Sequence, residues 1–351
     1  MFSRWLFVLL ALSILIAPPL LHAQTAEKTP RQDGVEAFRG EQVYSRACAT
    51  CHGKAGDGSG PSARYLDPLP RDFTLGIYKF RSTAAGMLPT DEDLYRTVTF
   101  GIPTTTMPPF VDVLTERERR DVVAYIKTFS KDFAKMPPAE PITIREEPEA
   151  TAQSIAEGKS IYIINACWTC HGTAGKGAGE AASSLKDVWG HKIRPVDFTL
   201  GEYKGGSDNR SIFRTLNTGL TGTPMPSYAE SFLYGSDSVQ LPPTLSKTYA
   251  DAEIAQLRAY LQSQPTREEI RDMSDSTKES LTDRRAWALV HYLKSLSREP
   301  GLWHRLFVED TEVTSDRLSS RSPWSCRRVA GFLCDRSHLL RWRWRGIDRS
   351  R

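Results

Sequence analysis

The chain has 351 residues, enough for about two domains of ordinary size. Hydrophobic residues make up 40% of it and charged residues 25%, which excludes both wholesale disorder and a protein built mainly of membrane spans. Residues 297–351 carry 12 arginines against 7 acidic residues, so the rest of the chain contributes −1 to the formal charge of +4 and gives no reason to expect nucleic-acid binding.

The chain begins with the pattern of an export signal. Arg4 precedes an apolar run from Trp5 to Ile16, and a small residue, Ala23, stands at the expected cleavage point. We therefore predict a signal peptide over 1–23 and a periplasmic location for the mature protein. An uncleaved membrane anchor is the alternative, although the run is shorter than the roughly 20 apolar residues that a span needs.

Two segments, 35–44 and 155–164, carry apolar residues three or four positions apart, which is the spacing of one helix face. Each contains a glycine, Gly40 or Gly158, where glycine costs a helix about 1 kcal/mol relative to alanine. A close crossing with another helix would account for both glycines. We therefore expect a second helix to cross each segment.

A later helix is expected to close each half of the chain. In the first half, Thr115 can cap a helix with Glu118 as its partner, and apolar residues continue to Phe129. In the second half, 251–262 and 282–296 both have a helical pattern. We favour the later segment, because its ending, Tyr-Leu-Lys-Ser-Leu, parallels the Tyr-Ile-Lys-Thr-Phe ending of the first-half helix.

The two halves of the chain resemble each other. The matched segments are 48–58 with 167–177, 70–79 with 195–204, and 96–108 with 214–226. A period of about 119 residues is much too long for a solenoid repeat and indicates a duplicated domain. We predict domains over 35–132 and 154–296, the second with an insertion, joined by a linker over 133–153.

Each half contains one C-x-x-C-H motif, and the residues of the two motifs are Cys48, Cys51 and His52, and Cys167, Cys170 and His171. Two thiols at this spacing can form thioether bonds to the vinyl groups of a haem, and the adjacent imidazole can then ligate the iron. A thioredoxin-like cysteine pair would need no following histidine, and a zinc site would draw four ligands from the pairs. We therefore predict two covalently attached haem c groups.

A second axial ligand for each iron is expected downstream. Met107 lies 55 residues after His52, and Met225 lies 54 residues after His171. Each methionine precedes a proline and follows a loop that contains glycine and threonine. A thioether opposite histidine raises the haem reduction potential, so this pattern is typical of an electron carrier.

On these motifs, the two halves resemble class I type cytochrome c domains over roughly 35–130 and 155–296. The resemblance implies an all-α fold of two tandem cytochrome c domains, each a small helical bundle around a covalently bound haem. It also implies that the segments at Pro70 and Pro195 supply the backbone carbonyl that orients the ligating histidine.

The resemblance makes three arginines, Arg71, Arg96 and Arg214, candidates for pairing with haem propionates. Plain surface exposure is the alternative for each of them. Arg71 has no counterpart in the second half, where Val196 occupies the matched position.

Three other residues have simpler interpretations. Trp168, inside the second motif, is interpreted as a packing residue. His191 and His291 have no counterparts in the first half, which favours surface or helix histidines over metal ligands.

We interpret the chain as an exported dihaem c-type cytochrome that relays single electrons between redox protein partners, with His/Met-ligated iron in each domain. One alternative is an electron-transfer subunit of a larger dehydrogenase or oxidase complex, either membrane-bound or periplasmic. Another is an enzyme, such as a dihaem peroxidase or a sulfur-compound oxidase, in which one iron needs an open position. A methionine in both distal positions argues against the enzyme.

The basic tail, 297–351, does not have the pattern of a folded domain. Its last 35 residues, from Arg317 onwards, contain 10 arginines, 3 tryptophans and no lysine. We hypothesise a frame-shifted or truncated reading of a longer gene. A membrane-surface patch of arginine and tryptophan is the alternative.

Overall fold

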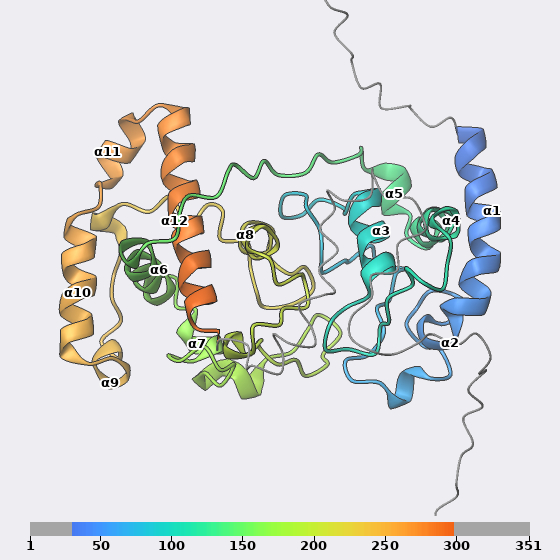
Figure 1. Ribbon diagram of the computed structural model, residues 1–351, viewed down its shortest axis with the longest axis horizontal. Helices are drawn as coiled ribbons and strands as arrows, with labels where there is room; N and C mark the ends of the chain where they lie inside the picture. The colour runs from blue at the N-terminus through green and yellow to red at the C-terminus, as the bar shows by residue number, and fades with distance from the viewer. Residues whose placement is uncertain (1–29, 298–351) are drawn as a thin grey trace, which may run out of the picture. The chain divides into compact units, whose positions relative to one another are not determined.

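The computed structural model describes residues 30–297 (Figure 1). Within this range the regular elements are helices, and pairing between extended segments is limited to two isolated bridges. The predicted all-α fold is therefore confirmed. No helix between residues 30 and 297 is both long enough and apolar enough to cross a bilayer. The predicted signal peptide and, apart from Ser297, the basic tail lie outside the described residues.

The first half contains five α-helices and one 3-10 helix: α1 (Pro30–Ala47), α2 (Ala49–His52), η1 (Ala63–Tyr65), α3 (Asp91–Phe100), α4 (Glu116–Thr128) and α5 (Asp132–Lys135). The second half contains seven α-helices and three 3-10 helices: α6 (Ala152–Ile164), α7 (Trp168–His171), η2 (Glu180–Ser184), η3 (Phe198–Leu200), α8 (Asn209–Thr218), η4 (Ser236–Ser238), α9 (Leu245–Thr248), α10 (Asp251–Gln262), α11 (Arg267–Asp272) and α12 (Asp275–Ser295).

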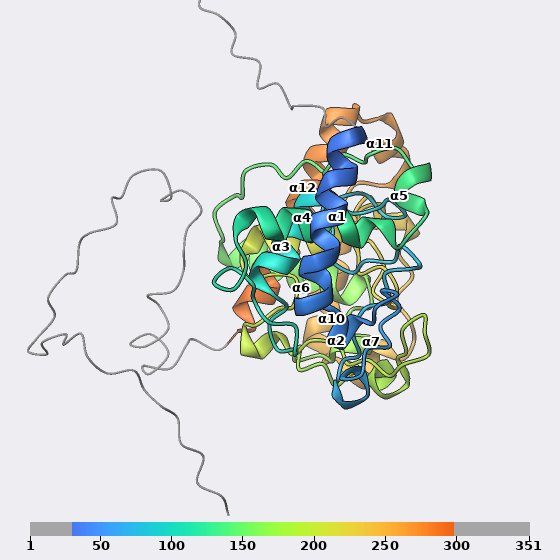
Figure 2. The same cartoon turned by 90° about the vertical axis from the view of Figure 1, so that its right-hand side faces the viewer.

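The first and last long helices of each half cross at a glycine. Helix α1 packs across α4, as Figure 2 shows, and a Cβ atom added to Gly40 would lie 2.0 Å from the carbonyl oxygen of Asp121. Helix α6 packs across α12 in the same way, where a Cβ on Gly158 would lie 1.9 Å from the carbonyl oxygen of Ala288. The close crossing expected from the two glycines is therefore present, and α12 is the helix that crosses α6.

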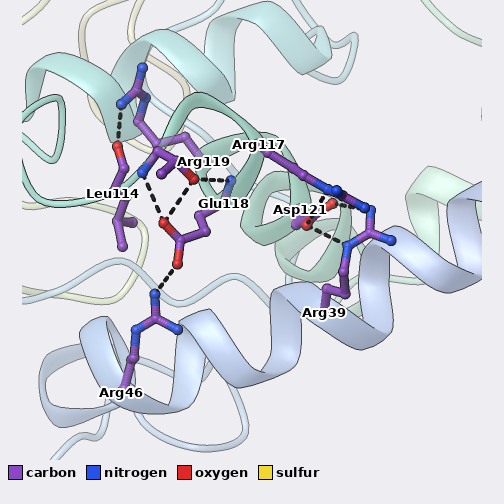
Figure 3. Close-up of polar contacts among 8 residues, drawn as sticks. Arg39, Arg46, Leu114, Arg117, Glu118, Arg119 and Asp121 are labelled. Carbon is purple, nitrogen blue, oxygen red and sulfur yellow. Dashed lines mark hydrogen bonds and ion pairs between the residues drawn. The ribbon is translucent and has the colours of Figure 1, made fainter.

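Polar contacts fix the α1–α4 pair at the end of α1 and next to the crossing point (Figure 3). Thr115 accepts a hydrogen bond from the backbone N–H of Glu118, and the Glu118 carboxylate accepts one from the backbone N–H of Thr115, which completes the predicted capping box. The same carboxylate pairs with Arg46 of α1. Arg39 donates two hydrogen bonds of 2.7 Å to the carboxylate of Asp121, next to the crossing point.

The segment predicted as a linker is attached to the second half. Its first residues belong to α5, and the stretch from 136 to 151 has no helix. Arg145 pairs with Glu279 and Asp283 of α12. Glu147 accepts a hydrogen bond of 2.6 Å from Asn209 and lies 3.3 Å from Nε2 of His291. These contacts hold the connection along the second half.

The insertion predicted in the second half, between Met225 and Asp251, contains η4 and α9, and α10 and α11 follow it before α12. Leu245, Tyr249 and Leu257 build a small apolar cluster with Ile163 of α6. Figure 1 shows α6 between α10 and α12, so α10, together with Leu245 of α9, covers the face of α6 that α12 leaves open.

The two halves touch through arginines of the first half. Arg81 is 3% exposed, donates a hydrogen bond of 2.6 Å to the carbonyl oxygen of Thr218, and bonds to the hydroxyl of Thr221. Arg96 donates to the carbonyl oxygen of Gly205 at 3.0 Å. A buried guanidinium with oriented acceptors is costly to separate from them, so these bonds stabilise the contact between the halves.

The crossing glycines generate a stability prediction. Gly40→Ala and Gly158→Ala should each lower the free energy of unfolding by about 1–3 kcal/mol or more, because the new methyl group would overlap a backbone carbonyl that cannot rotate away. Gly34→Ala, in the same helix as Gly40 but with nothing within 4 Å of its added Cβ, is the matched control and should raise it by up to about 1 kcal/mol. Urea unfolding checks both, and equal stability of Gly40→Ala and Gly34→Ala would contradict the close crossing.

Candidate functional site

In each half, the second cysteine and the histidine lie on one short helix, α2 or α7, and the first cysteine is the N-cap residue of that helix. Helix α1 ends at Ala47, and the backbone N–H of His52 donates to the carbonyl of Cys48 at 2.9 Å. The backbone N–H of His171 donates to the carbonyl of Cys167 at the same distance. This turn brings both thiols and the imidazole of each motif into one cluster.

All four of these cysteines are free thiols. Burial raises the pKa of Cys48 to about 11 and that of Cys167 to about 12. Both thiols are therefore protonated at neutral pH, whereas a thioredoxin-like pair needs a thiolate stabilised by nearby positive groups. The raised pKa values of Cys48 and Cys167 are therefore not those of a cysteine pair that exchanges disulfides.

The two motif histidines have the same hydrogen-bonding pattern. Nδ1 of His52 donates to the carbonyl oxygen of Arg71 at 3.0 Å, and Nδ1 of His171 donates to that of Val196 at 3.2 Å. Because a carbonyl oxygen only accepts, Nδ1 carries the proton in both rings. Burial lowers the pKa of both histidines, so each ring is neutral and its Nε2 has a free lone pair for a metal.

The carbonyls that accept these bonds lie in the two segments that the resemblance indicated. The segments are those at Pro70 and Pro195, and the acceptors are the residues that follow, Arg71 and Val196. The glycine-rich loops explain the position. Gly58 has φ +75°, and a Cβ there would lie 2.8 Å from the carbonyl oxygen of Pro70, so only glycine lets the loop pack against this segment.

Two pairs of aromatic residues support the motifs and were not assigned a role from sequence. The Phe73 ring stacks on His52 with centroids 4.6 Å apart, and Phe198 stacks on His171 at 4.4 Å. The hydroxyl of Tyr44 donates to the carbonyl of Gly53 at 2.8 Å, and that of Tyr162 to the carbonyl of Gly172 at 2.6 Å. The sequence signal that could have identified these aromatic residues is that each occupies a matched position in the two halves.

The two methionine loops contain the same backbone hydrogen bond to a threonine hydroxyl. The backbone N–H of Met107 donates to the Thr105 hydroxyl at 3.1 Å, and that of Met225 to the Thr223 hydroxyl at 3.2 Å. Met107 packs at the edge of the same apolar core as Cys48, and Met225 at the edge of the core that contains Cys167. The structure therefore brings each predicted methionine and its cysteine motif to one core.

The other singled-out residues have structural contacts. Trp168 packs edge-on against Tyr249, with centroids 6.0 Å apart, as expected of a packing residue. His191 is partly exposed and lies 3.6 Å from Asp187. His291 is a helix histidine but is buried, 3% exposed. Ser154 forms a hydrogen bond of 2.9 Å with its Nδ1, and Glu147 lies near its Nε2.

The residues present fit a covalent haem in each half. Tyr78 and Tyr203, at matched positions, are buried and their hydroxyls have no hydrogen-bond partner among the described residues. The Arg71 guanidinium forms no ion pair with a carboxylate of the described chain. Arg96 and Arg214 form none either, but both already donate to the carbonyl of Gly205 and the hydroxyl of Ser211, so Arg71 is the arginine that most needs an acceptor. Buried donors and unpaired cations of this kind are satisfied by carboxylates, which a haem carries as propionates.

Comparison with known proteins identifies the family. A model of cytochrome c oxidase, cbb3-type, subunit III matches residues 36–126, and a model of cytochrome c matches residues 155–265. The chain belongs to the cytochrome c family. Its two cytochrome c domains stand in tandem. The second match ends before α12, although α12 packs on α6 as α4 packs on α1.

Two relatives of this cytochrome c are known as parts of larger assemblies. It is 29% identical over 185 residues to the cbb3-type cytochrome c oxidase subunit FixPc of Rhizobium leguminosarum bv. viciae. The aligned residues make up 52% of this chain and 55% of the relative. This chain thus spans about half the length of that relative. A solved chain of the Kuenenia stuttgartiensis reducing HAO-like protein complex is 37% identical, with a TM-score of 0.58 over 74% of this chain and 96% of that chain.

The glycine loop beside His52 generates a second prediction. Gly58→Ala should displace the carbonyl that holds His52, reduce the fraction of chains that carry haem, and destabilise the fold by more than the ~1–2 kcal/mol that a left-handed backbone costs a residue other than glycine. Gly86→Ala is the control, because Gly86 also has a positive φ (+85°) but open space around its Cβ. Intact mass and urea unfolding measure the two effects, and equal behaviour of the two variants would contradict this role for Gly58.

Proposed function

We propose that this cytochrome c is an exported electron carrier with two covalently attached haem groups, which passes single electrons between redox protein partners. The observation that carries the proposal is the match between the halves. In each, a Cys-Cys-His turn, a carbonyl on histidine Nδ1 and a methionine loop border one apolar core. In this proposal, Cys48 and Cys51 attach one haem, and Cys167 and Cys170 attach the other.

The chain's own residues would keep both iron sites closed. His52 and Met107 would ligate the first iron, and His171 and Met225 the second. When bound, the haem iron supplies a one-electron ferric/ferrous couple. The thioether ligands would raise the reduction potential, and the apolar cores beside them would keep water away from the metal. If a histidine and a methionine held each iron in this way, neither iron would offer a substrate an open position, which favours a carrier over a peroxidase-like enzyme.

We further propose that this carrier works as an electron-transfer subunit of a larger redox complex. One relative is named as an oxidase subunit, and the similar solved chain comes from a protein complex. Co-purification of the tagged full chain with a redox enzyme from its native membranes or periplasm tests this setting. Recovery of the chain alone, under conditions that keep other redox complexes intact, would count against it.

The proposed periplasmic location rests on the segment 1–23. A mature protein that begins after Ala23 and is released with the periplasmic fraction supports export with cleavage. A mature protein that retains Met1 and remains with the membranes supports the uncleaved anchor.

Replacement of the methionines tests the axial ligands. Met107→Ala should lower the reduction potential of one haem on the order of 0.1 V, a fraction of the roughly 0.8 V over which axial ligands set haem potentials, and Met225→Ala should lower that of the other haem. A bond between methionine sulfur and haem iron gives a weak near-infrared absorption band. Each variant should lose this band for the haem whose methionine was replaced, and only that haem should then bind cyanide readily.

Met87→Ala is the matched control, because Met87 is also partly buried but has no methionine partner in the second half. It should leave both potentials unchanged. Unaltered potentials in Met107→Ala and Met225→Ala, with haem content preserved, would remove the ligand assignment. Ready binding of cyanide by the unaltered protein would favour the enzyme instead.

A further inference from the structure

One contact joins the second half to the histidine site of the first. The guanidinium carbon of Arg71 lies 4.4 Å from the centroid of the Trp189 ring. Arg71 is also the residue whose carbonyl accepts the hydrogen bond from His52. Trp189 of the second half therefore contacts the side chain of the residue whose backbone carbonyl orients the predicted axial histidine of the first half.

The loop that carries Trp189 is held in place by its own hydrogen bonds. The carboxylate of Asp187 accepts from the backbone N–H groups of Trp189 at 3.0 Å and His191 at 2.9 Å. The backbone N–H of Val188 donates to the carbonyl of Gly222 at 3.1 Å. At Gly222 an added Cβ would lie 3.2 Å from the Trp189 ring, so the indole packs closely and its direction is fixed.

Polar groups around this contact lack partners. Nε1 of Trp189 and the hydroxyl of Tyr78 are buried and have no hydrogen-bond partner among the described residues. The side chains of Arg71 and Lys79 are partly buried. Neither Arg71 nor Lys79 forms an ion pair with a carboxylate of the described chain. Burying such donors and cations is unfavourable unless an anion accepts from them.

We propose that Nε1 of Trp189 and the guanidinium of Arg71 bind one propionate carboxylate of the haem attached at Cys48 and Cys51, so that the second half completes the haem site of the first. This inference rests on the proposed covalent haem. A carboxylate has two oxygens, which can accept from an indole N–H and a guanidinium at the same time. Stacking of the guanidinium on the indole ring sets the angle between these two donors.

The arrangement makes the two haem sites unequal. Val196 stands in the second half at the position matched to Arg71, so the second haem has no such guanidinium from its own half. A cation and a donor beside a propionate offset its negative charge and favour the ferrous iron. Trp189 and Arg71 would therefore raise the potential of the first haem.

Trp189→Phe in the full-length haem protein tests the proposal, because phenylalanine keeps a ring on Arg71 and removes the N–H. Potentiometric titration at several pH values resolves the two haems, which the Met107 and Met225 variants assign to their halves. Trp189→Phe should lower the reduction potential of the first haem. At the applied potential where the first haem of the wild type is half reduced, the ferric-to-ferrous ratio of that haem in the variant should therefore be several-fold higher. The pH-dependent step of that potential should move to higher pH, because loss of a donor to the ionised form raises the pKa of the propionate.

Arg71→Gln should shift the first haem in the same direction, and the two substitutions together should depart from additivity because both groups bind one carboxylate. Trp287→Phe is the matched control. Trp287 is a core residue of the second half whose Nε1 is also buried without a partner, and its substitution should leave the first haem unchanged.

Unchanged potentials and pH dependence in Trp189→Phe, or an equal shift of the second haem, would overturn the proposal. Intact mass separates this failure from failure of the proposed function. If Trp189→Phe carries two haems with unshifted potentials, only the Trp189 inference is contradicted. If the wild-type protein carries no haem, both the inference and the proposed function are contradicted.

Discussion

The site in each half depends on one hydrogen bond, from Nδ1 of the motif histidine to a backbone carbonyl. The bond fixes the tautomer and the plane of the ring, and thereby leaves Nε2 as the only nitrogen that can ligate a metal. The acceptor segment can approach because Gly58 and Gly177 have no side chains. The helix before the motif is fixed in turn by its crossing at Gly40 or Gly158. Backbone packing therefore sets the direction of each imidazole.

The two halves share this arrangement but are not equivalent. The second half has three further helices, α9, α10 and α11, between its methionine loop and α12, and it carries the loop with Trp189 that contacts Arg71. Arg81 and Arg96 of the first half donate to backbone carbonyls of the second. These contacts involve residues that have no counterpart in the other half, or matched residues in different surroundings. If each half binds a haem as proposed, the two haems would therefore have different reduction potentials.

Sequence predicted the parts of the site that depend on local spacing. The C-x-x-C-H turns, the capping box at Thr115 and the crossing at Gly40 follow from residues a few positions apart, and the structure contains all three arrangements. Contacts between distant segments could not be predicted in this way. The burial of His291 depends on Glu147, and the Arg71–Trp189 contact depends on how the halves meet. A single sequence records neither.

The most direct test of covalent haem attachment is the mass of the mature protein made in a host that attaches haem c, followed by peptide mapping. The account predicts the polypeptide mass plus two haems, with one haem on the peptide that contains Cys48 and Cys51 and one on the peptide that contains Cys167 and Cys170. A mass equal to that of the polypeptide alone, or a single haem confined to one motif, would contradict it.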